Sequence, residues 1–460
     1  MASRSPRVLL FHPGTLYGAE SVVRKVVKTT LVEFFSFLRA HDVDVEVLDL
    51  QAEFGNPRPE AVDEYLRVGS DRLLSFDFDV LAVSCWSSHE YLASVEFAER
   101  VRAQRPDALI VVGGYHPTAV PADFAYAGTP FDIVVTGEGE LALLALLRDG
   151  RPRGGDRPPR VVAGTPLPLD RIYFDIDEYP YLTPRPVDVG VFLSRGCPYR
   201  CTFCMEPHAG RTRWRHLSVE KAVELMEKAR ACNPRRIVIH DACFGYLNAW
   251  RHEFLQALVD RGFDLPLWAE MRGDRMTSAD LELCEKLDFW LQFGVETMSP
   301  RMAEIMRKAR TGATYVSNVD KTLREVNRRH ILAKVFLLLN HPGETGETAE
   351  ETVSYFERFV AEHERITVIV NTSKFHYYPG TDTALRRGFY ESTYGTRFAN
   401  LEWYKERTPQ FALSQAQRAS ADLGDITPYV ERIQALQPQL VRKMPAAQQL
   451  QFLQQLNEIG

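Results

Sequence analysis

One stretch of the chain carries three closely spaced cysteines: Arg195-Gly196-Cys197-Pro198-Tyr199-Arg200-Cys201-Thr202-Phe203-Cys204. It follows an apolar run over residues 189–193, and its cysteine spacing is C-x3-C-x2-C. Thiolates at this spacing predict ligands for three irons of a cubic [4Fe–4S] cluster, with the fourth iron open for chemistry. Two alternatives stay open, a structural zinc site completed by His208 and three unrelated core cysteines, although C-x3-C-x2-C is not a usual zinc spacing.

The decapeptide resembles the cluster loop of radical S-adenosylmethionine (SAM) enzymes, in which an aromatic residue precedes the third cysteine, as Phe203 does here. In that family the amino and carboxylate groups of SAM chelate the open iron. One electron from the cluster then cleaves SAM to methionine and a 5′-deoxyadenosyl radical. The resemblance implies a [4Fe–4S] cluster and SAM as cofactors, with Cys197, Cys201 and Cys204 as catalytic metal ligands and Phe203 beside the SAM site.

Length and composition set the broad class. A chain of 460 residues is too long for one ordinary core, so two or three domains are expected. Lys plus Arg is 55 and Asp plus Glu is 61, a net charge of −6, so we predict a small-molecule or peptidic substrate and no nucleic-acid partner. The N-terminal residues resemble no signal peptide, and no apolar run has membrane length, so no membrane association is expected. Seven cysteines, three of them clustered, favour a reducing compartment and a cytoplasmic location.

Residues 1–149 alternate short apolar runs with helical patterns. Strands are predicted at residues 7–11, 43–50, 78–86, 108–113 and 131–136, and a long helix at residues 20–39. This alternation predicts an α/β domain with a doubly wound, Rossmann-like parallel sheet. In such sheets ligands bind beyond the carboxyl ends of the strands, where glycine-rich turns let the backbone approach phosphate.

Three strand ends of this domain resemble those of the cobalamin-binding domain that precedes many radical SAM modules. They are residues 78–84, the turn Gly113-Gly114-Tyr115-His116-Pro117-Thr118, and residues 132–140. The resemblance implies cobalamin as a cofactor, with Ser84, Gly113, Gly114, His116 and Thr118 as binding residues. The alternative is a plain flavodoxin-like domain with tight turns.

One part of the cobalamin-binding pattern is missing. In methionine-synthase-like domains a D-x-H-x-x-G loop supplies a histidine to cobalt, but here His12 is followed by Pro13-Gly14-Thr15. We therefore expect no histidine from this loop to reach cobalt. Tyr17 and Trp86 are candidates to lie near the lower face of the cofactor, with simple packing against the sheet as the equal alternative.

Proline, glycine and arginine dominate residues 150–186, which predicts an extended linker without regular helix or sheet. A second strand and helix pattern covers residues 187–389. Strands are predicted at residues 188–194, 236–242, 265–271, 289–296, 333–339 and 367–375, and helices at 219–231, 249–261, 278–287, 300–307, 319–329 and 347–362. Six such units match the (βα)6 partial TIM barrel of the radical SAM family and are too few for a closed eight-stranded barrel.

The ends of the barrel strands carry turns that resemble those of the family. They are His240-Asp241-Ala242-Cys243-Phe244, Glu270-Met271-Arg272, Gly294-Val295-Glu296-Thr297, Asn340-His341-Pro342-Gly343-Glu344-Thr345 and Tyr378-Pro379-Gly380-Thr381. The resemblance implies that Asp241, Arg272 and Glu296 bind SAM, together with Glu206 in the turn after the last cysteine. The alternative is that the barrel-mouth charges pair with one another, because a buried charge without a partner is costly.

Residues 390–460 contain no cysteine, which argues against a second cluster there. Helices are predicted over residues 415–421 and, in pieces, over 428–456. We expect a small helical region that acts as a lid or brace over the open side of the partial barrel.

Resemblance to the cobalamin-dependent (class B) radical SAM methylases implies a C-methyltransferase that acts on an amino acid or a natural-product intermediate. In that class one SAM methylates cobalamin, a second SAM yields the 5′-deoxyadenosyl radical, and the substrate radical takes the methyl group from methylcobalamin. The alternative is a radical rearrangement, cyclisation or oxidation in which cobalamin is absent or does not transfer methyl, and a redox sensor is a third hypothesis. An external electron donor such as flavodoxin is the expected partner.

Overall fold

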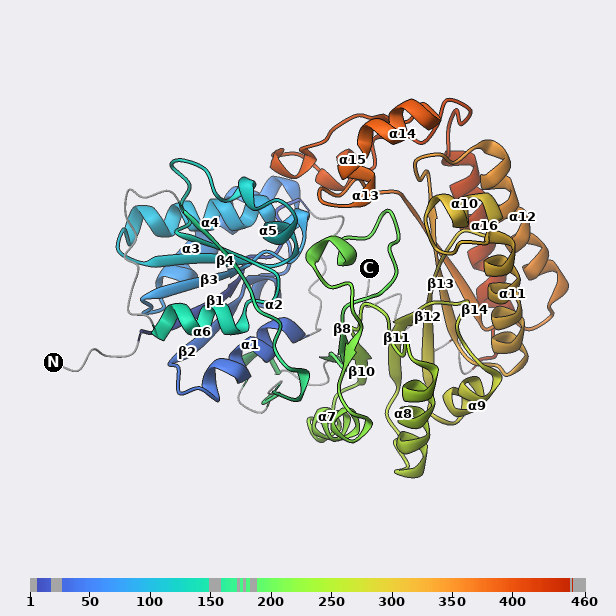
Figure 1. Cartoon of the computed structure of the whole chain (residues 1–460), viewed down its shortest axis with the longest axis horizontal. Coiled ribbons are helices and arrows are strands. Elements are labelled where there is room, and N and C mark those ends of the chain that lie inside the picture. The colour runs from blue at the N-terminus through green and yellow to red at the C-terminus, as the bar shows by residue number, and fades with distance from the viewer. Residues whose placement is uncertain are drawn as a thin grey trace.

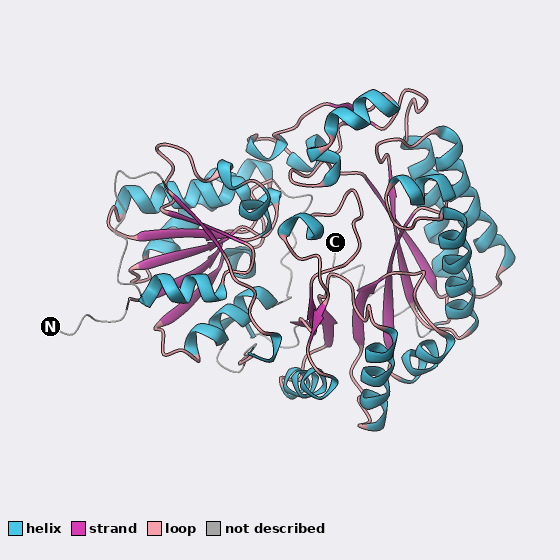
Figure 2. Cartoon of the chain, viewed as in Figure 1, coloured by secondary structure: helices cyan, strands magenta, loops and turns pink. Residues whose placement is uncertain are grey.

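The computed structural model describes residues 6–17, 27–148, 159–171, 174–176, 179–182, 188–446 and 449. Two large parallel sheets lie beside each other, the first with helices on both faces and the second with helices along its outer side (Figure 1, Figure 2). No helix in these segments is long and apolar enough to cross a membrane.

The N-terminal sheet has the strand order β2-β1-β3-β4-β5-β6, and all its pairs are parallel. The strands are apolar and buried, as expected for a parallel sheet covered on both faces. After β1 the chain first adds β2 on one side and then β3 on the other, which puts the switch point of the sheet between β1 and β3. The doubly wound prediction is confirmed. The elements are β1 (Val8–His12), α1 (Thr29–Arg39), β2 (Val45–Asp49), α2 (Leu50–Phe54), α3 (Val62–Leu74), β3 (Val80–Ser84), α4 (Tyr91–Gln104), β4 (Leu109–Gly113), α5 (Tyr115–Ala119), β5 (Ile133–Thr136), α6 (Glu140–Arg148) and β6 (Arg160–Ala163).

Two details of this domain differ from the sequence predictions. The expected linker contains β6, which pairs with β5, so the prediction of no regular structure over residues 150–186 is wrong there. The run Arg160-Val161-Val162-Ala163 has no proline and two β-branched residues, and an edge strand tolerates the prolines before it. The helix predicted from residue 20 begins at Thr29, and residues 18–26 lie outside the described segments.

The second sheet has the order β14-β13-β12-β11-β10-β7, again with all pairs parallel. Because β7 and β14 are its two edges, the barrel is open, which confirms the partial (βα)6 barrel. Its strands are β7 (Asp188–Val191), β10 (Arg236–Ile239), β11 (Leu267–Met271), β12 (Phe289–Glu296), β13 (Ala333–Leu339) and β14 (Val368–Lys374). Its helices are α7 (Val219–Ala231), α8 (Asn248–Asp260), α9 (Ser278–Lys286), α10 (Pro300–Ile305), α11 (Gly312–Arg328) and α12 (Gly346–Glu362).

Helix α11 begins seven residues before its predicted start. Its first turns contain glycine, threonine and valine, which have weak helix propensity, so the sequence pattern did not mark them. Tertiary contacts hold them instead. Tyr315 is 1% exposed, and its hydroxyl donates a hydrogen bond to the carbonyl of Val295, 2.8 Å away.

The C-terminal region is only partly helical. It contains α13 (Asp382–Leu385), α14 (Arg387–Tyr394), β15 (Arg397–Phe398), α15 (Gln410–Ser414), β16 (Gln417–Arg418) and α16 (Thr427–Lys443). The helix predicted over residues 415–421 is wrong, because β16 pairs there with β15 and the carbonyl of Gln417 accepts a hydrogen bond from Asn340. Helix α16 contacts α12 and β14 on the outside of the barrel, while the predicted helical residues 450–456 lie outside the described segments.

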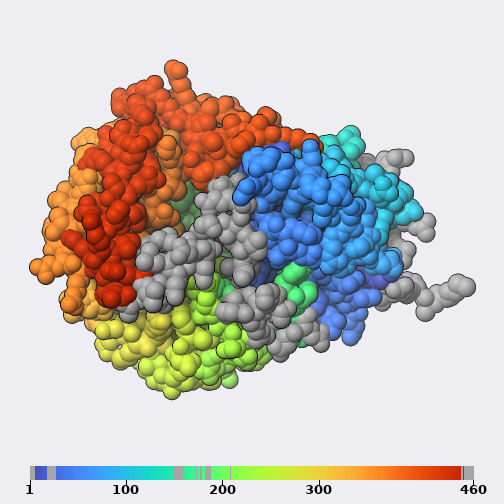
Figure 3. Space-filling model, turned by 180° about the vertical axis from the view of Figure 1, so that it is seen from behind, coloured from blue at the N-terminus to red at the C-terminus, as the bar shows by residue number. Residues whose placement is uncertain are grey.

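The C-terminal region extends to the N-terminal domain, and the two lie side by side at the top of the space-filling view (Figure 3). The Tyr404 hydroxyl donates a hydrogen bond to Asp123 Oδ2 (2.7 Å), and Lys405 Nζ lies 2.8 Å from Asp123 Oδ1. The C-terminal region therefore connects the barrel to the first domain.

Candidate functional site

The cysteine loop follows the first barrel strand. After β7 the short strand β8 (Ser194–Arg195) pairs with β9 (Arg215–His216), and the loop from Gly196 to Cys204 projects beyond this pair. Gly196 has φ +91°, and a Cβ there would lie 2.2 Å from the carbonyl oxygen of Arg213. The close backbone contact requires glycine, and the N–H of Cys197 donates to the carbonyl of Arg211 at 2.9 Å.

The three loop cysteines differ from the other four. Cys197, Cys201 and Cys204 are half-buried thiols, whereas the remaining cysteines are buried. A hydrogen bond from the Cys243 thiol lowers the pKa of Cys197 to about 7, while burial raises the pKa of Cys201 and Cys204. In the described residues no three His, Cys, Asp or Glu side chains converge as ligands of one metal ion. A cubic cluster places a different iron at each thiolate, and a loop with three accessible thiols fits that requirement.

Asp241, predicted to bind SAM, holds the start of this loop in place. It is 2% exposed and follows β10. Its Oδ1 accepts hydrogen bonds from the N–H of Leu193 (2.8 Å) and of Ser194 (3.0 Å), and its Oδ2 accepts one from the Ser194 hydroxyl (2.5 Å). Both oxygens are thus engaged by the chain, and the contacts give Asp241 a positioning role.

Arg272 and Glu296 lie at the barrel mouth, but each pairs with a residue that sequence reasoning did not select. Arg272 binds Asp274 through Nε (2.9 Å) and Nη2 (3.1 Å), and Glu296 pairs with the buried Lys308. Both residues therefore form ion pairs within the protein, as the alternative to SAM binding supposed, but with other partners than expected. Arg272 also lies over the ring of Tyr199 at 3.9 Å. Its Nη1 is buried without a partner in the described chain and is available to an acceptor such as a carboxylate.

Glu206 and Phe203 complete the loop. Glu206 is 4% exposed and accepts a hydrogen bond from the hydroxyl of Tyr115, a residue of the N-terminal domain. Arg211 donates to the same hydroxyl at 3.1 Å. Phe203 is half-buried and packs its ring edge-on to His341, with 6.2 Å between the ring centroids. The end of the cysteine loop is therefore connected directly to the strand ends of the first domain.

Those strand ends form one wall of an open cavity, whose empty space, counted out into the solvent, is about 990 Å³. Residues from both domains line it: Ser84, Trp86, Gly113, Gly114, Tyr115, Thr118, Gly137, Glu138 and Glu140 near the strand ends, Leu31, Glu33 and Phe34 on α1, and Phe192, Arg195, Ala209 and Arg211 near the cysteine loop. The structure thus brings together five of the residues predicted to bind cobalamin. Gly114 has φ +128°, and a Cβ there would lie 2.1 Å from the carbonyl oxygen of Cys85, so only glycine fits this turn.

Two other predicted cobalamin-binding residues do not line this cavity. His116 is fully buried between Ser88, 2.7 Å from Nδ1, and Asp123, 3.2 Å from Nε2. Its position in the sequence motif was right, but α5 turns its ring toward the core of the domain. Tyr17 packs against the core next to β1. Thr118 lines the cavity, yet its hydroxyl already accepts from the N–H of Gly137 and donates to the carbonyl of Gly114.

Both ring nitrogens of His12 lie within hydrogen-bond distance of buried carboxylates. Its Nδ1 lies 2.9 Å from Asp49 and its Nε2 lies 3.2 Å from Glu90. Burial opposes protonation of His12, but these carboxylates raise its pKa above the usual value. Glu90 also accepts a hydrogen bond from the N–H of Trp86 (2.5 Å), so this buried cluster fixes the turn that carries Trp86.

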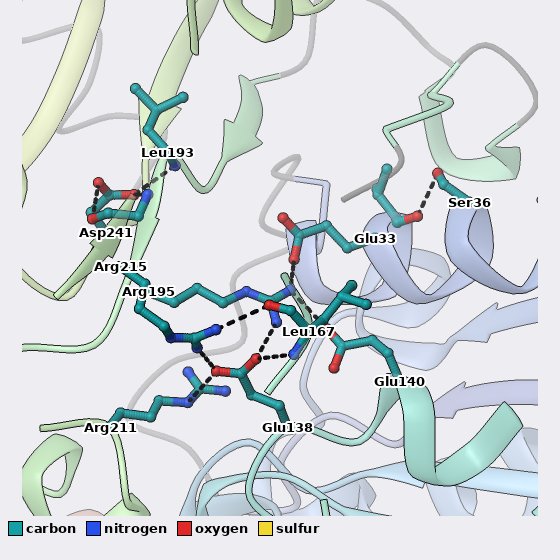
Figure 4. Close-up of polar contacts among 12 residues, drawn as sticks. Glu33, Ser36, Glu138, Glu140, Leu167, Leu193, Arg195, Arg211, Arg215 and Asp241 are labelled. Atoms are coloured by element: carbon teal, nitrogen blue, oxygen red, sulfur yellow. Dashed lines mark hydrogen bonds and ion pairs between the residues drawn. The ribbon is translucent and has the colours of Figure 1, made fainter. Parts of the chain in front are cut away.

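A cage of charges joins the cavity to the cysteine loop (Figure 4). Arg195 is 7% exposed and extends toward three buried glutamates of the first domain, Glu33, Glu138 and Glu140. Its Nη2 lies 2.8 Å from Glu33 and 2.7 Å from Glu140, and its Nη1 lies 3.1 Å from Glu138. Arg215 also pairs with Glu138. The sequence motifs contained Arg195 and two of the glutamates but gave no sign that they meet.

Fold and site together define a class of protein in which a doubly wound cofactor-binding domain lies against the cysteine loop of a partial barrel. Two family models match the chain, the B12 binding domain over residues 34–147 and the Radical SAM superfamily over residues 191–356. The chain therefore belongs to the radical SAM superfamily, as an enzyme with an N-terminal B12 binding domain.

Several methyltransferases are similar to the chain. An uncharacterized methyltransferase of Pyrococcus horikoshii is 25% identical over 399 residues, 82% of each chain. The cytidylyl-2-hydroxyethylphosphonate methyltransferase of Streptomyces wedmorensis is 25% identical over 424 residues, 77% of each chain. The radical SAM methyltransferase TsrM of Kitasatospora setae, solved with tryptophan and a SAM analogue, has the same fold with a TM-score of 0.67. It is 19% identical, and the match covers 96% of this chain and 90% of that one.

Proposed function

We propose that this enzyme is a cobalamin-dependent radical SAM C-methyltransferase that uses two SAM molecules and acts on an amino acid or a natural-product intermediate. The single observation that carries the proposal is the shared cavity. Its walls come from the strand ends of the B12 binding domain and from Arg195, Ala209 and Arg211 beside the cysteine loop. A cofactor held in this cavity would adjoin a cluster held on the loop, and both would then serve one substrate.

When bound, these cofactors supply a methyl carrier and a one-electron reductant of SAM. The side chains of the protein position these cofactors. Cys197, Cys201 and Cys204 would hold the cluster, and Ser84, Trp86, Gly113 and Gly114 would face the cobalamin. The unpartnered Nη1 of Arg272 offers a donor to the carboxylate of SAM, while the ion pair of Lys308 with Glu296 keeps a second polar group at the barrel mouth.

The relatives support methyl transfer and leave the substrate open. Both curated relatives described above are named methyltransferases, and TsrM was solved with tryptophan. Phosphonate and amino-acid substrates share only that they are small molecules. We infer a small-molecule substrate for this chain, with an external one-electron donor such as flavodoxin.

Anaerobic reconstitution with iron, sulfide and hydroxocobalamin, followed by desalting and incubation with SAM and a reductant, tests the proposal. Cobalamin retained on the protein, together with S-adenosylhomocysteine and 5′-deoxyadenosine as products, is the expected result. Formation of 5′-deoxyadenosine without retained cobalamin would replace methyl transfer by another radical reaction. Cys201→Ala is the control and should lose both the cluster absorbance and SAM cleavage.

A further inference from the structure

Two buried carboxylate oxygens at the cavity wall have no donor. Glu33 on α1 and Glu140 at the start of α6 both line the cavity and are 4% and 3% exposed. Within the described residues, neither Oε1 of Glu33 nor Oε2 of Glu140 has a hydrogen-bond partner. Burying an acceptor without a hydrogen-bond partner is costly, so two of them on one cavity wall require an explanation.

Arg195 explains the orientation of both side chains. Its Nη2 pairs with Oε2 of Glu33 and with Oε1 of Glu140. The second oxygen of each carboxylate therefore points away from the guanidinium (Figure 4). Glu138 differs, because both of its oxygens have partners: Arg195 and the N–H of Leu167 on one, Arg215 on the other. Among the three glutamates of the cage, as far as the structure describes their surroundings, the oxygens without a hydrogen-bond donor therefore belong to Glu33 and Glu140.

The charge of the cage favours neutral donors over cations. One guanidinium faces Glu33 and Glu140, and burial, followed by the nearby Glu140, raises the pKa of Glu33 to about 7. Arg215 pairs with Glu138, and Arg211, which also lines the cavity, lies 4.0 Å from Glu138, so three guanidinium groups accompany the three carboxylates. With these cations present, a further cation is not needed for neutrality, and N–H or O–H donors suit the two oxygens.

We propose that Glu33 and Glu140 are cofactor-binding residues whose free oxygens accept hydrogen bonds from neutral donors on the periphery of cobalamin, with Arg195 as their positioning residue. The inference rests on the proposed function. Cobalamin offers such donors in two places, the carboxamide side chains of its corrin ring and the ribose hydroxyl of its nucleotide.

Binding titrations of the full chain test this assignment. Absorbance or fluorescence titration with hydroxocobalamin at pH 8, above the raised pKa of Glu33, gives Kd for the wild type, Glu33→Gln and Glu140→Gln. In each variant Arg195 holds the remaining oxygen, so an amide nitrogen takes the place of the free carboxylate oxygen and cannot accept a hydrogen bond. We expect Kd to rise about 10- to 100-fold in each variant, as for loss of one hydrogen bond to a charged acceptor.

The matched control is Glu64→Gln on α3, a glutamate that is 63% exposed and should leave Kd unchanged. Glutamine is isosteric and relieves repulsion within the cage, so both cavity variants should fold. If either does not, Glu33→Asp keeps the charge but withdraws the carboxylate from the cavity and should also weaken binding.

Dicyanocobinamide, which lacks the nucleotide, identifies the donor. If the glutamine variants also bind dicyanocobinamide more weakly than the wild type does, the donors are the corrin carboxamides. If they are weaker only toward hydroxocobalamin, the donor is the ribose. Either result supports the proposal. Wild-type affinity in both glutamine variants would overturn it and leave the proposed function intact. A wild-type protein that does not bind hydroxocobalamin would overturn the proposed function itself.

Discussion

Replacing Asp241 by alanine removes the acceptor that fixes the start of the cysteine loop. The side chain is 2% exposed and accepts hydrogen bonds from the N–H groups of Leu193 and Ser194 and from the Ser194 hydroxyl. In Asp241→Ala the hydroxyl can rotate to another partner, but the two backbone donors stay buried. Each costs about 1–3 kcal/mol without an acceptor, so the free energy of unfolding should fall by about 2–6 kcal/mol.

Asp241→Asn is the matched control for this loss. Its oxygen can accept both backbone hydrogen bonds, and its amide nitrogen can donate to the Ser194 hydroxyl, which reverses one bond without breaking it. We expect a loss of about 1 kcal/mol or less. Burial raises the pKa of Asp241 to about 7, so a measurement at pH 8 compares the variants with an ionised wild-type carboxylate.

Urea unfolding followed by circular dichroism under anaerobic conditions measures the difference, and iron per chain after reconstitution reports the loop itself. The alanine variant should show both a lower midpoint and reduced iron, while the asparagine variant stays near the wild type. If alanine and asparagine gave the same midpoint, the hydrogen bonds of Asp241 would not be what stabilises this loop.

Three further changes have defined outcomes. Arg195→Gln leaves buried carboxylates without their shared cation and should lower the free energy of unfolding by about 3–5 kcal/mol in urea titration. An unchanged unfolding midpoint would show that the cage of charges does not stabilise the protein. Burial raises the pKa of Glu344 from 4.5 to about 8, so the folded form binds its proton more tightly and stability should fall as pH rises between these values. Glu344→Gln should flatten that pH dependence, and an identical slope in both proteins would contradict the assignment. Tyr404→Phe loses the hydrogen bond to Asp123 and should lower the free energy of unfolding by about 1 kcal/mol. Proteolysis of the C-terminal region should also become faster. Equal cleavage rates in the two proteins would argue that this contact does not hold the C-terminal region on the first domain.

Local pattern predicted most of the fold. Strands β12 and β13 and helix α7 lie at the predicted residues, because apolar alternation and helical periodicity are properties of short stretches of sequence. The cysteine loop could also be recognised from the sequence, because its three predicted ligands are neighbours in the chain. Where tertiary contacts override weak propensity, as at the start of α11 and at β16, the sequence pattern failed.

The site was harder to predict because its partners are distant in sequence and a motif does not fix where a side chain points. Arg195 and Glu33 are 162 residues apart, and no local signal joins them. His116 belongs to the right motif, yet its ring faces Ser88 and Asp123. Lys308, the partner of Glu296, lies after a barrel helix and outside every strand-end motif.

The two domains are connected at both ends of the cysteine loop. Arg195 stands two residues before the first cysteine and binds Glu33, Glu138 and Glu140, and Glu206 stands two residues after the last cysteine and binds Tyr115. Because each contact residue stands two positions from a cysteine in the chain, the distance from the cavity to the cysteines is set by these side chains. The spacing between the two proposed cofactor sites therefore depends on buried charge and hydrogen bonds.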